Sequence, residues 1–88
     1  MPDTFDDLLK KLSKDSWPSV YMFKFILPSD NHKIALIESF FEDDAEINHQ
    51  PSTNGKYISI TVRQVMLSAE AVIDVYKKVS SIEGVISL

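Results

Sequence analysis

The chain has 88 residues, 13 acidic and nine basic side chains, and a formal net charge of −4. This length supports one small domain, and the scattered cations lack the clustered basic surface that nucleic-acid binding usually needs. The absence of cysteine excludes a disulfide framework, a thiolate metal site and a cysteine nucleophile.

The ends and the hydropathy of the chain predict its compartment. The first residues, Met1–Thr4, carry neither a basic cap nor an apolar run, so they are not typical of a signal peptide. No apolar stretch approaches the roughly 20 residues that span a bilayer. We therefore expect a cytoplasmic protein with no membrane partner.

The first predicted element is a short helix at residues 4–14. Asp3 or Thr4 is suited to cap it, and a helix of about ten residues is not stable alone in water. Its apolar stripe must therefore dock, either on this domain or on a partner. We assign residues 1–19 to this helix and its connector, and residues 20–88 to the folded domain. The stripe consists of Phe5, Leu8, Leu9 and Leu12.

A strand rich in aromatic residues is predicted from Val20 to Leu27. Pro18 precedes it and disfavours helical geometry at Trp17. Burying an unpaired Lys24 would be costly, so the face that carries the lysine should be exposed. Alternation places Met22, Lys24 and Ile26 on that face, and Tyr21, Phe23, Phe25 and Leu27 on the inner one.

Pro28 ends this strand, and Ser29 or Asp30 is suited to cap a helix that extends to about Phe41. Its predicted apolar side chains are Ile34, Leu36, Ile37, Phe40 and Phe41. The acidic residues 42–44 follow the helix. They fit either a solvated turn or a metal cluster, and we expect the turn because no fixed ligand spacing accompanies them.

A hairpin is the clearest pattern in the chain. Asn54-Gly55 supplies two residues that tolerate positive φ, between a weak strand at residues 46–50 and a strong one at residues 56–65. Pro51 places the weak strand at a sheet edge. Alternation in the strong strand puts Tyr57, Ser59, Thr61 and Arg63 on one face, and Ile58, Ile60 and Val62, with Val65 as a further candidate, on the other.

A third helix and a closing strand complete the chain. Ser68 is suited to cap the helix, predicted over residues 69–80, and Gly84 marks the exit into a short strand at residues 85–88. The buried stripe of the helix is predicted to contain Val72, Val75, Tyr76 and Val79.

This order of elements predicts an α+β fold of the ferredoxin-like βαββαβ type. Four antiparallel strands form one sheet, both domain helices cover one of its faces, and the short N-terminal helix is an addition. The first and third strands occupy the centre of such a sheet. They are also the two strongest strand patterns in this chain.

Three segments carry a resemblance to a known family: Tyr21–Lys24, the hairpin at Pro51–Val62, and Ile82–Val85. Through them residues 20–88 resemble the YbeD-like family of small bacterial proteins of unknown function. The resemblance implies an ACT-like variant of the ferredoxin fold, a fold of domains that sense amino acids and regulate metabolic enzymes. It implies no established activity. Effector-binding ACT domains commonly have glycine after the first strand, whereas no glycine precedes Gly55 here.

No catalytic motif is present. The sequence has no paired-histidine metal motif, no nucleophile elbow and no glycine-rich phosphate loop. His32 and His49 fall on different predicted elements, and nothing in the sequence brings them together. We therefore expect no enzyme activity, no cofactor and no metal.

The exposed face of the sheet is the first candidate site. It combines apolar and cationic groups that are favoured at protein interfaces, which suggests a regulatory or adaptor module that binds a protein partner or a second copy, through this face or through an edge strand. The alternative is that the N-terminal helix covers the face. The predicted face residues are Met22, Lys24, Ile26, Tyr57, Ser59, Thr61 and Arg63.

A small-ligand sensor of the ACT type is the second hypothesis. The N–H groups at the start of the helix after the first strand suit the carboxylate of an amino acid or organic acid. The predicted ligand residues are Pro28, Ser29, Asp30, Asn31 and His32. RNA binding on the sheet face is less favoured, since Tyr57 alone is placed to stack a base and the chain is acidic.

Overall fold

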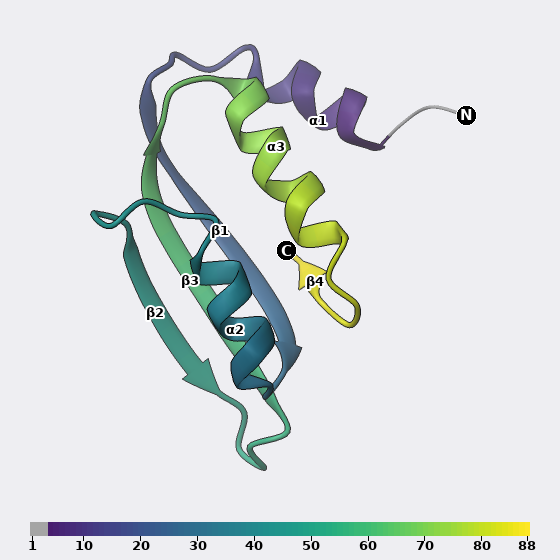
Figure 1. Ribbon diagram of the computed structural model, residues 1–88. Helices are drawn as coiled ribbons and strands as arrows, with labels where there is room; N and C mark the ends of the chain where they lie inside the picture. Colours follow the sequence, from purple (N-terminus) through teal and green to yellow (C-terminus); the bar gives the residue numbers. More distant parts are fainter. Residues whose placement is uncertain (1–3) are drawn as a thin grey trace.

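The computed structural model describes residues 4–88 and has an α+β architecture (Figure 1). Three helices and four strands follow one another in the predicted order. They are α1 (Thr4–Leu12), β1 (Ser19–Pro28), α2 (Asn31–Glu38), β2 (Glu46–Pro51), β3 (Tyr57–Met66), α3 (Ala69–Ser80) and β4 (Ile86–Ser87).

The strands form one antiparallel sheet in the order β2-β3-β1-β4. The two long strands, β1 and β3, therefore lie at the centre, as predicted. Phe25 pairs with Ile60 between them and with Ser87 of β4. The edges are weak pairing surfaces, because β2 ends at Pro51 and β4 has only two residues.

The predicted inner face of β1 is confirmed. Phe23, Phe25 and Leu27 have no exposed area, whereas Lys24 is exposed on the opposite side. This orientation follows from the cost of removing an unpaired ammonium from water, set against the gain from burying the rings.

One residue of β3 faces the other way from its prediction. Val65 is 57% exposed, although it was a candidate for the inner face. The alternation of β3 continues unbroken to its end, so the even-numbered Val62 and Met66 point inward and Val65 points outward.

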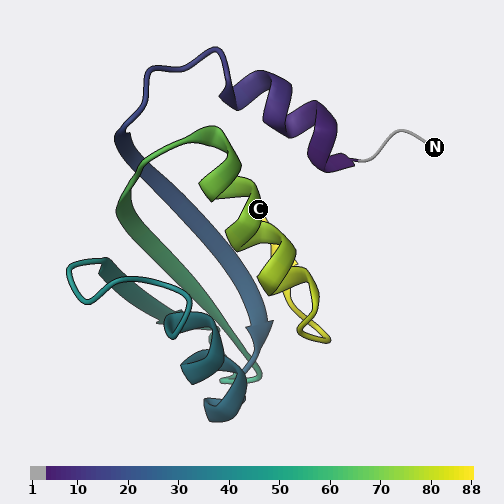
Figure 2. The ribbon, with the colours of Figure 1, turned by 45° about the horizontal axis from the view of Figure 1, so that its top comes forward.

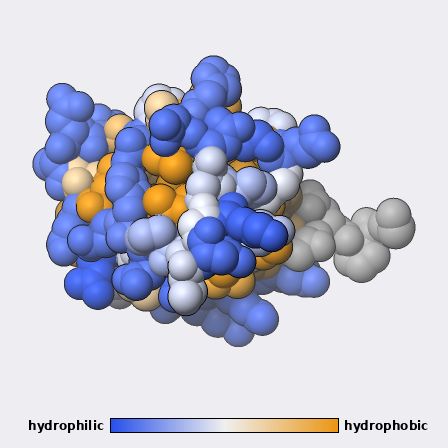
Figure 3. Space-filling model, turned by 90° about the horizontal axis from the view of Figure 1, so that it is seen from below, coloured by the Kyte–Doolittle hydropathy of each residue, from blue (hydrophilic) through white to orange (hydrophobic). Residues whose placement is uncertain are grey.

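Two helices cover the inner face of the sheet (Figures 1 and 2). Ile37 of α2 and Val72 of α3 are fully buried in the same core as the strands. Aromatic rings fill the middle of this core: the centroid of Phe23 lies 5.4 Å from that of Tyr76 and 5.2 Å from that of Phe41. Seen from below, apolar atoms show in the middle of the surface among hydrophilic side chains (Figure 3).

The bounds of α3 agree with the prediction. The Ser68 hydroxyl accepts the N–H of Ala71 at 3.1 Å, and all four residues of the predicted stripe are buried. The closing strand β4 is shorter than the predicted residues 85–88.

Helix α2 ends at Glu38, earlier than the predicted Phe41. The Ser39 hydroxyl donates to the carbonyl oxygen of Leu36 at 2.6 Å, and the N–H groups of Phe40 and Phe41 bond three residues back. Such bonds tighten the last turn and end the helix. The side chain of Phe41 thereby reaches Phe23.

The hairpin turn also differs from the prediction. Within this turn only Gly55 has a positive φ, at 74°, so Asn54 does not use the left-handed region. A turn closes from Ser52 to Gly55 through an N–H···O bond of 2.9 Å, and the Asn54 side chain accepts the N–H of Lys56 at 3.0 Å. Asn54 contributes its carbonyl oxygen rather than its backbone flexibility.

Helix α1 docks beside α3, on the helical side of the domain (Figure 2). Leu12 is buried in the common core, and the Trp17 indole donates to its carbonyl oxygen at 2.9 Å. The alternative in which this helix covers the exposed face of the sheet is therefore wrong. The predicted caps at Asp3 and Thr4 lie outside the described side chains.

Candidate functional site

The face of the sheet that points away from the helices is uncovered by any described element, and we call it the open face. It consists of the outward positions of β1, β2 and β3 with the end of the chain at β4. All seven predicted face residues lie on it. Its members are Val20, Met22, Lys24, Ile26, Glu46, Asn48, Gln50, Tyr57, Ser59, Thr61, Arg63, Val65, Ile86 and Leu88.

Apolar side chains lie at both ends of the open face. At one end Val20 pairs directly with Val65, next to Met22. At the other end Ile26 pairs with Ile86, and Tyr57 follows on β3. Except for Ile26, which is partly covered, each of these side chains is at least half exposed. Exposed apolar side chains that adjoin one another are a feature of interaction surfaces, whereas scattered ones are common on any protein.

Two cations lie between these apolar ends. Lys24 pairs with Thr61, and Arg63 lies between Met22 and Glu46. Within residues 4–88 the only contact of a basic with an acidic side chain within 4.0 Å is that of His49 with Glu38, so neither cation has a carboxylate within ion-pair distance. The centre of the open face is therefore a positive area on an acidic chain.

A hollow of about 200 Å³ adjoins the Tyr57 end of the open face. Ile26, Tyr57 and Ser59 line it from the face, and Gln50 and Pro51 line it from the edge strand. The wall of the hollow therefore includes an aromatic ring, an aliphatic side chain and the polar groups of Gln50 and Ser59.

The loop after β1, the alternative ligand site, is occupied by its own side chains. Asp30 caps α2, and its carboxylate accepts the N–H groups of His32 at 2.9 Å and Lys33 at 3.3 Å. The N–H of Ser29 bonds to the Lys56 carbonyl oxygen. Two N–H groups that an acid ligand would use already have an acceptor.

This loop is also closed from the side by the turn before β4. The Lys33 ammonium donates to the Glu83 carbonyl oxygen at 2.7 Å. The next residue, Gly84, lies against the Pro28 ring, since a Cβ added to Gly84 would be 3.5 Å from that ring. Asn31 and His32 remain exposed. The ligand-sensor hypothesis for this loop stays a prediction that no contact here favours.

The two histidines lie apart, as the sequence indicates. His32 lies in the first turn of α2, whereas His49 lies on β2 and contacts Glu38, the last residue of α2, at 2.7 Å. Among the described residues, no cluster of histidine and acidic side chains is placed to hold a metal ion.

Across residues 4–88, no helix has both the length and the apolar character that a membrane crossing requires.

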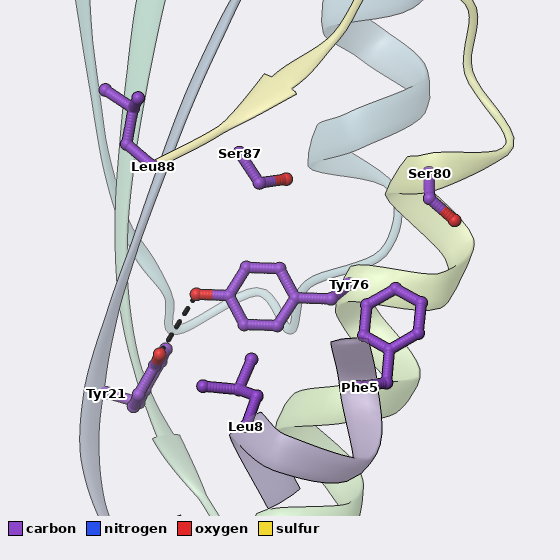
Figure 4. A pocket seen from close by; sticks show the side chains of 7 residues that line it. All are labelled: Phe5, Leu8, Tyr21, Tyr76, Ser80, Ser87 and Leu88. Atoms are coloured by element: carbon purple, nitrogen blue, oxygen red, sulfur yellow. Dashed lines mark hydrogen bonds between the residues drawn. The ribbon is translucent and has the colours of Figure 1, made fainter. Parts of the chain in front are cut away.

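A second hollow, which sequence reasoning missed, lies on the helical side of the sheet (Figure 4). It has a volume of about 450 Å³ and lies between α1, α3, β1 and β4. Tyr21 and Tyr76 meet at its wall, where their hydroxyl oxygens are 3.0 Å apart. Its remaining lining comes from Phe5, Leu8, Ser80, Ser87 and Leu88. We call it the tyrosine pocket.

Burial perturbs one group of this pocket. Loss of solvent raises the pKa of Tyr76 above its ordinary value of 10.0, and the hydrogen bond to Tyr21 raises it further. The hydroxyl is therefore neutral across the physiological pH range.

No sequence signal could have identified the tyrosine pocket, because it exists only where α1 docks.

Residues 12–88 match a family described as proteins of unknown function, DUF493. The chain belongs to the DUF493 family. This confirms the predicted YbeD-like family, to which DUF493 proteins usually correspond. No curated protein matches the chain, and no solved structure matches it.

The DUF493 match includes the whole sheet, α2 and α3. It begins at Leu12, the last residue of α1, and not at the predicted residue 20. The open face therefore belongs to the family domain. Phe5 and Leu8 of the tyrosine pocket precede the matched region.

Proposed function

We propose that this DUF493 domain is a non-catalytic adaptor or regulatory module that binds a protein partner through the open face. One observation carries the proposal: the exposed large apolar side chains of the described chain gather on this face, around two cations without ion-pair partners. Six of the eight exposed large hydrophobic residues belong to the face, namely Val20, Met22, Tyr57, Val65, Ile86 and Leu88.

The face is a better candidate than an edge strand. Partners that extend a sheet need a row of free backbone groups on a long edge. Here Pro51 removes a donor at one end of β2, and β4 offers only two residues. Side-chain contacts on the face are therefore favoured over strand addition.

Charge indicates what kind of partner fits. Lys24 and Arg63 lie in the middle of the apolar area, where a bound surface would remove them from water. Buried charges are tolerated when they are paired. The partner is therefore expected to present acidic side chains opposite these two residues, surrounded by apolar ones.

A second copy of the chain fits this surface poorly. Symmetric pairing of two open faces would bring Lys24 and Arg63 of both copies into one interface, and each copy offers only Glu46 as an acidic member of the face. Like charges in one interface oppose association. A different, acidic protein surface is therefore favoured over self-association.

The hollow beside Tyr57 is the expected anchor point. Interfaces concentrate their binding energy in a few well-packed pockets, often with tyrosine in the wall. An apolar side chain of the partner that enters between Tyr57 and Ile26 would add contact area next to the cationic centre.

For the fold we propose the ferredoxin-like class in its ACT-like variant. The support is the antiparallel sheet with β1 and β3 central and the helices α2 and α3 on one face. The proposed function does not depend on this classification, because a fold alone does not specify a function.

Charge reversal on the open face tests the proposed function. The Lys24→Glu, Arg63→Glu double variant should capture about tenfold less of the partner from a lysate of the cells in which the protein naturally occurs. A tenfold loss of affinity is equivalent to roughly 1.4 kcal/mol of binding free energy. The matched control Lys14→Glu, Lys78→Glu makes the same charge change at exposed positions after α1 and on α3, away from the open face, and should capture normally.

Two outcomes would contradict the proposed function. One is equal loss in both double variants, which would indicate a general effect of net charge. The other is capture unaffected by Lys24→Glu, Arg63→Glu but abolished by a change on α3. Sedimentation of the purified protein checks the second-copy alternative, and we expect a monomer.

A further inference from the structure

We propose that the tyrosine pocket is a binding site for a small uncharged organic molecule that carries an apolar ring and one hydroxyl group. This inference does not rest on the proposed partner-binding function. The pocket lies on the helical side of the sheet and the open face lies on the other, with Leu88 as the one residue that belongs to both (Figure 4).

The size and the walls of the pocket suit such a ligand. Its volume of about 450 Å³ falls within the range of small-molecule sites, roughly 300–1,000 Å³. Phe5 and Leu8 cover it from α1, Tyr76 closes it from α3, and Tyr21 closes it from β1. Residues from four elements therefore converge on one space.

Two small side chains explain why the space is not filled. Ser80 ends α3 and Ser87 lies on β4, and both line the pocket (Figure 4). A larger apolar residue at either position would project into the volume between α1 and the sheet. The side chain of Tyr76 points into the same region, so the ring of a ligand would meet an aromatic wall.

The polar groups of the wall determine the chemistry of the ligand. A hydrogen bond between Tyr21 and Tyr76 uses one hydroxyl hydrogen, and the other O–H and the remaining lone pairs are left for a bound molecule. One ligand hydroxyl can both donate to and accept from this pair. Phenols and cyclic alcohols have this combination.

Charge is disfavoured in the pocket. None of its seven lining residues is Asp, Glu, Lys, Arg or His, although the Lys77 ammonium lies 5.9 Å from the centroid of the Phe5 ring. Burial already raises the pKa of Tyr76 by disfavouring its anion. A carboxylate or an ammonium group would lose hydration, and no charged side chain in the pocket wall would compensate for that loss. The pocket therefore differs in ligand class from the acid-binding loop predicted after β1.

The test is a titration with phenol and cyclohexanol, followed by amide chemical shifts. We expect saturable shifts clustered at residues around Tyr21, Tyr76 and Ser87, with a dissociation constant on the order of 1 mM, as is usual for so small a ligand. Benzoate and anilinium salts of the same ring size should shift these amides at least tenfold less at equal concentration.

A filling variant provides the matched control. Ser80→Leu should abolish the saturable shifts, whereas Ser81→Leu, one residue further along at the exposed cap of α3, should retain them. Tyr21→Phe removes one hydroxyl and should weaken cyclohexanol binding severalfold. If Ser80→Leu keeps the shifts, or if the parent protein shows none at 10-fold above the expected constant, the proposal is wrong.

Discussion

Tyr76 connects the aromatic core to the tyrosine pocket, and its raised pKa makes stability depend on pH. The unfolded phenol ionises near 10.0, but the folded one stays protonated to higher pH. Above pH 10 the unfolded state therefore binds fewer protons than the folded state, and the free energy of unfolding falls as pH rises. Below pH 10 the two states are equally protonated at this group.

Tyr76→Phe should remove the part of the fall in unfolding free energy above pH 10 that comes from this phenol. We expect the slope of unfolding free energy between pH 10 and pH 11.5 to be shallower in the variant than in the parent. Urea unfolding at several pH values measures it. Tyr57→Phe, at an exposed tyrosine on the open face, is the matched control and should leave the slope unchanged. Equal slopes in Tyr76→Phe and the parent would contradict the account.

Single capping residues begin two of the helices. Asp30 accepts two N–H groups from the first turn of α2, and Ser68 accepts one from the first turn of α3. Replacing either with alanine should lower the free energy of unfolding by about 1 kcal/mol, because those N–H groups lose their acceptor. Urea unfolding checks this against the exposed Ser13→Ala. A loss no greater than that of Ser13→Ala would refute the capping assignment.

At the scale of elements, α1 is the helix whose docked position the sequence predicts least. Its leucine stripe docks on α3, and Leu12 is buried in the common core. Leu12→Ala should therefore lower the free energy of unfolding by about 2–5 kcal/mol, the usual cost of truncating a core leucine.

Leu67 supplies the matched control for that substitution. It is 76% exposed between β3 and α3, so Leu67→Ala removes the same atoms from a wet position and should cost far less. Denaturant unfolding of both variants decides the matter. Equal losses would mean that α1 does not dock as described.

Local signals in the sequence predict elements whose ends are chemically marked. Ser68 caps α3 and a regular apolar stripe follows, so its bounds are confirmed. The end of α2 was wrong because nothing in the helical pattern marks the bond from Ser39 to Leu36. Val65 was misplaced because its apolar character, rather than the strict alternation of β3, decided the prediction.

The open face and the tyrosine pocket also differ in how far the sequence alone predicts them. The predicted residues of the open face do share one surface, because a strand places alternate side chains on one side whatever its partners are. Val20 and Ile86 were missed, since their exposure depends on where the ends of the sheet lie. The tyrosine pocket could not be predicted, because it requires the docked position of α1.

At the scale of the whole molecule, the domain has two unlike sides. The helical side holds the core, α1 and the tyrosine pocket, and the other side is the open face, with Lys24 and Arg63 at its centre. Because the partner surface is expected to be acidic, raising salt from about 0.05 to 0.5 M should weaken partner capture severalfold, since salt screens exposed charges. Capture that is insensitive to salt would contradict the charge-based part of the proposal.

The most direct test of the open face is site-specific photo-crosslinking in the parent cells. A photoreactive side chain at Met22 or Val65 reports on the open face, and one at Ser81 or Lys78 reports on the helical side. We predict one discrete adduct with another protein from the two open-face positions, lost on charge reversal at Lys24 and Arg63. An adduct of equal yield from Ser81 or Lys78, with none from Met22 or Val65, would contradict the account.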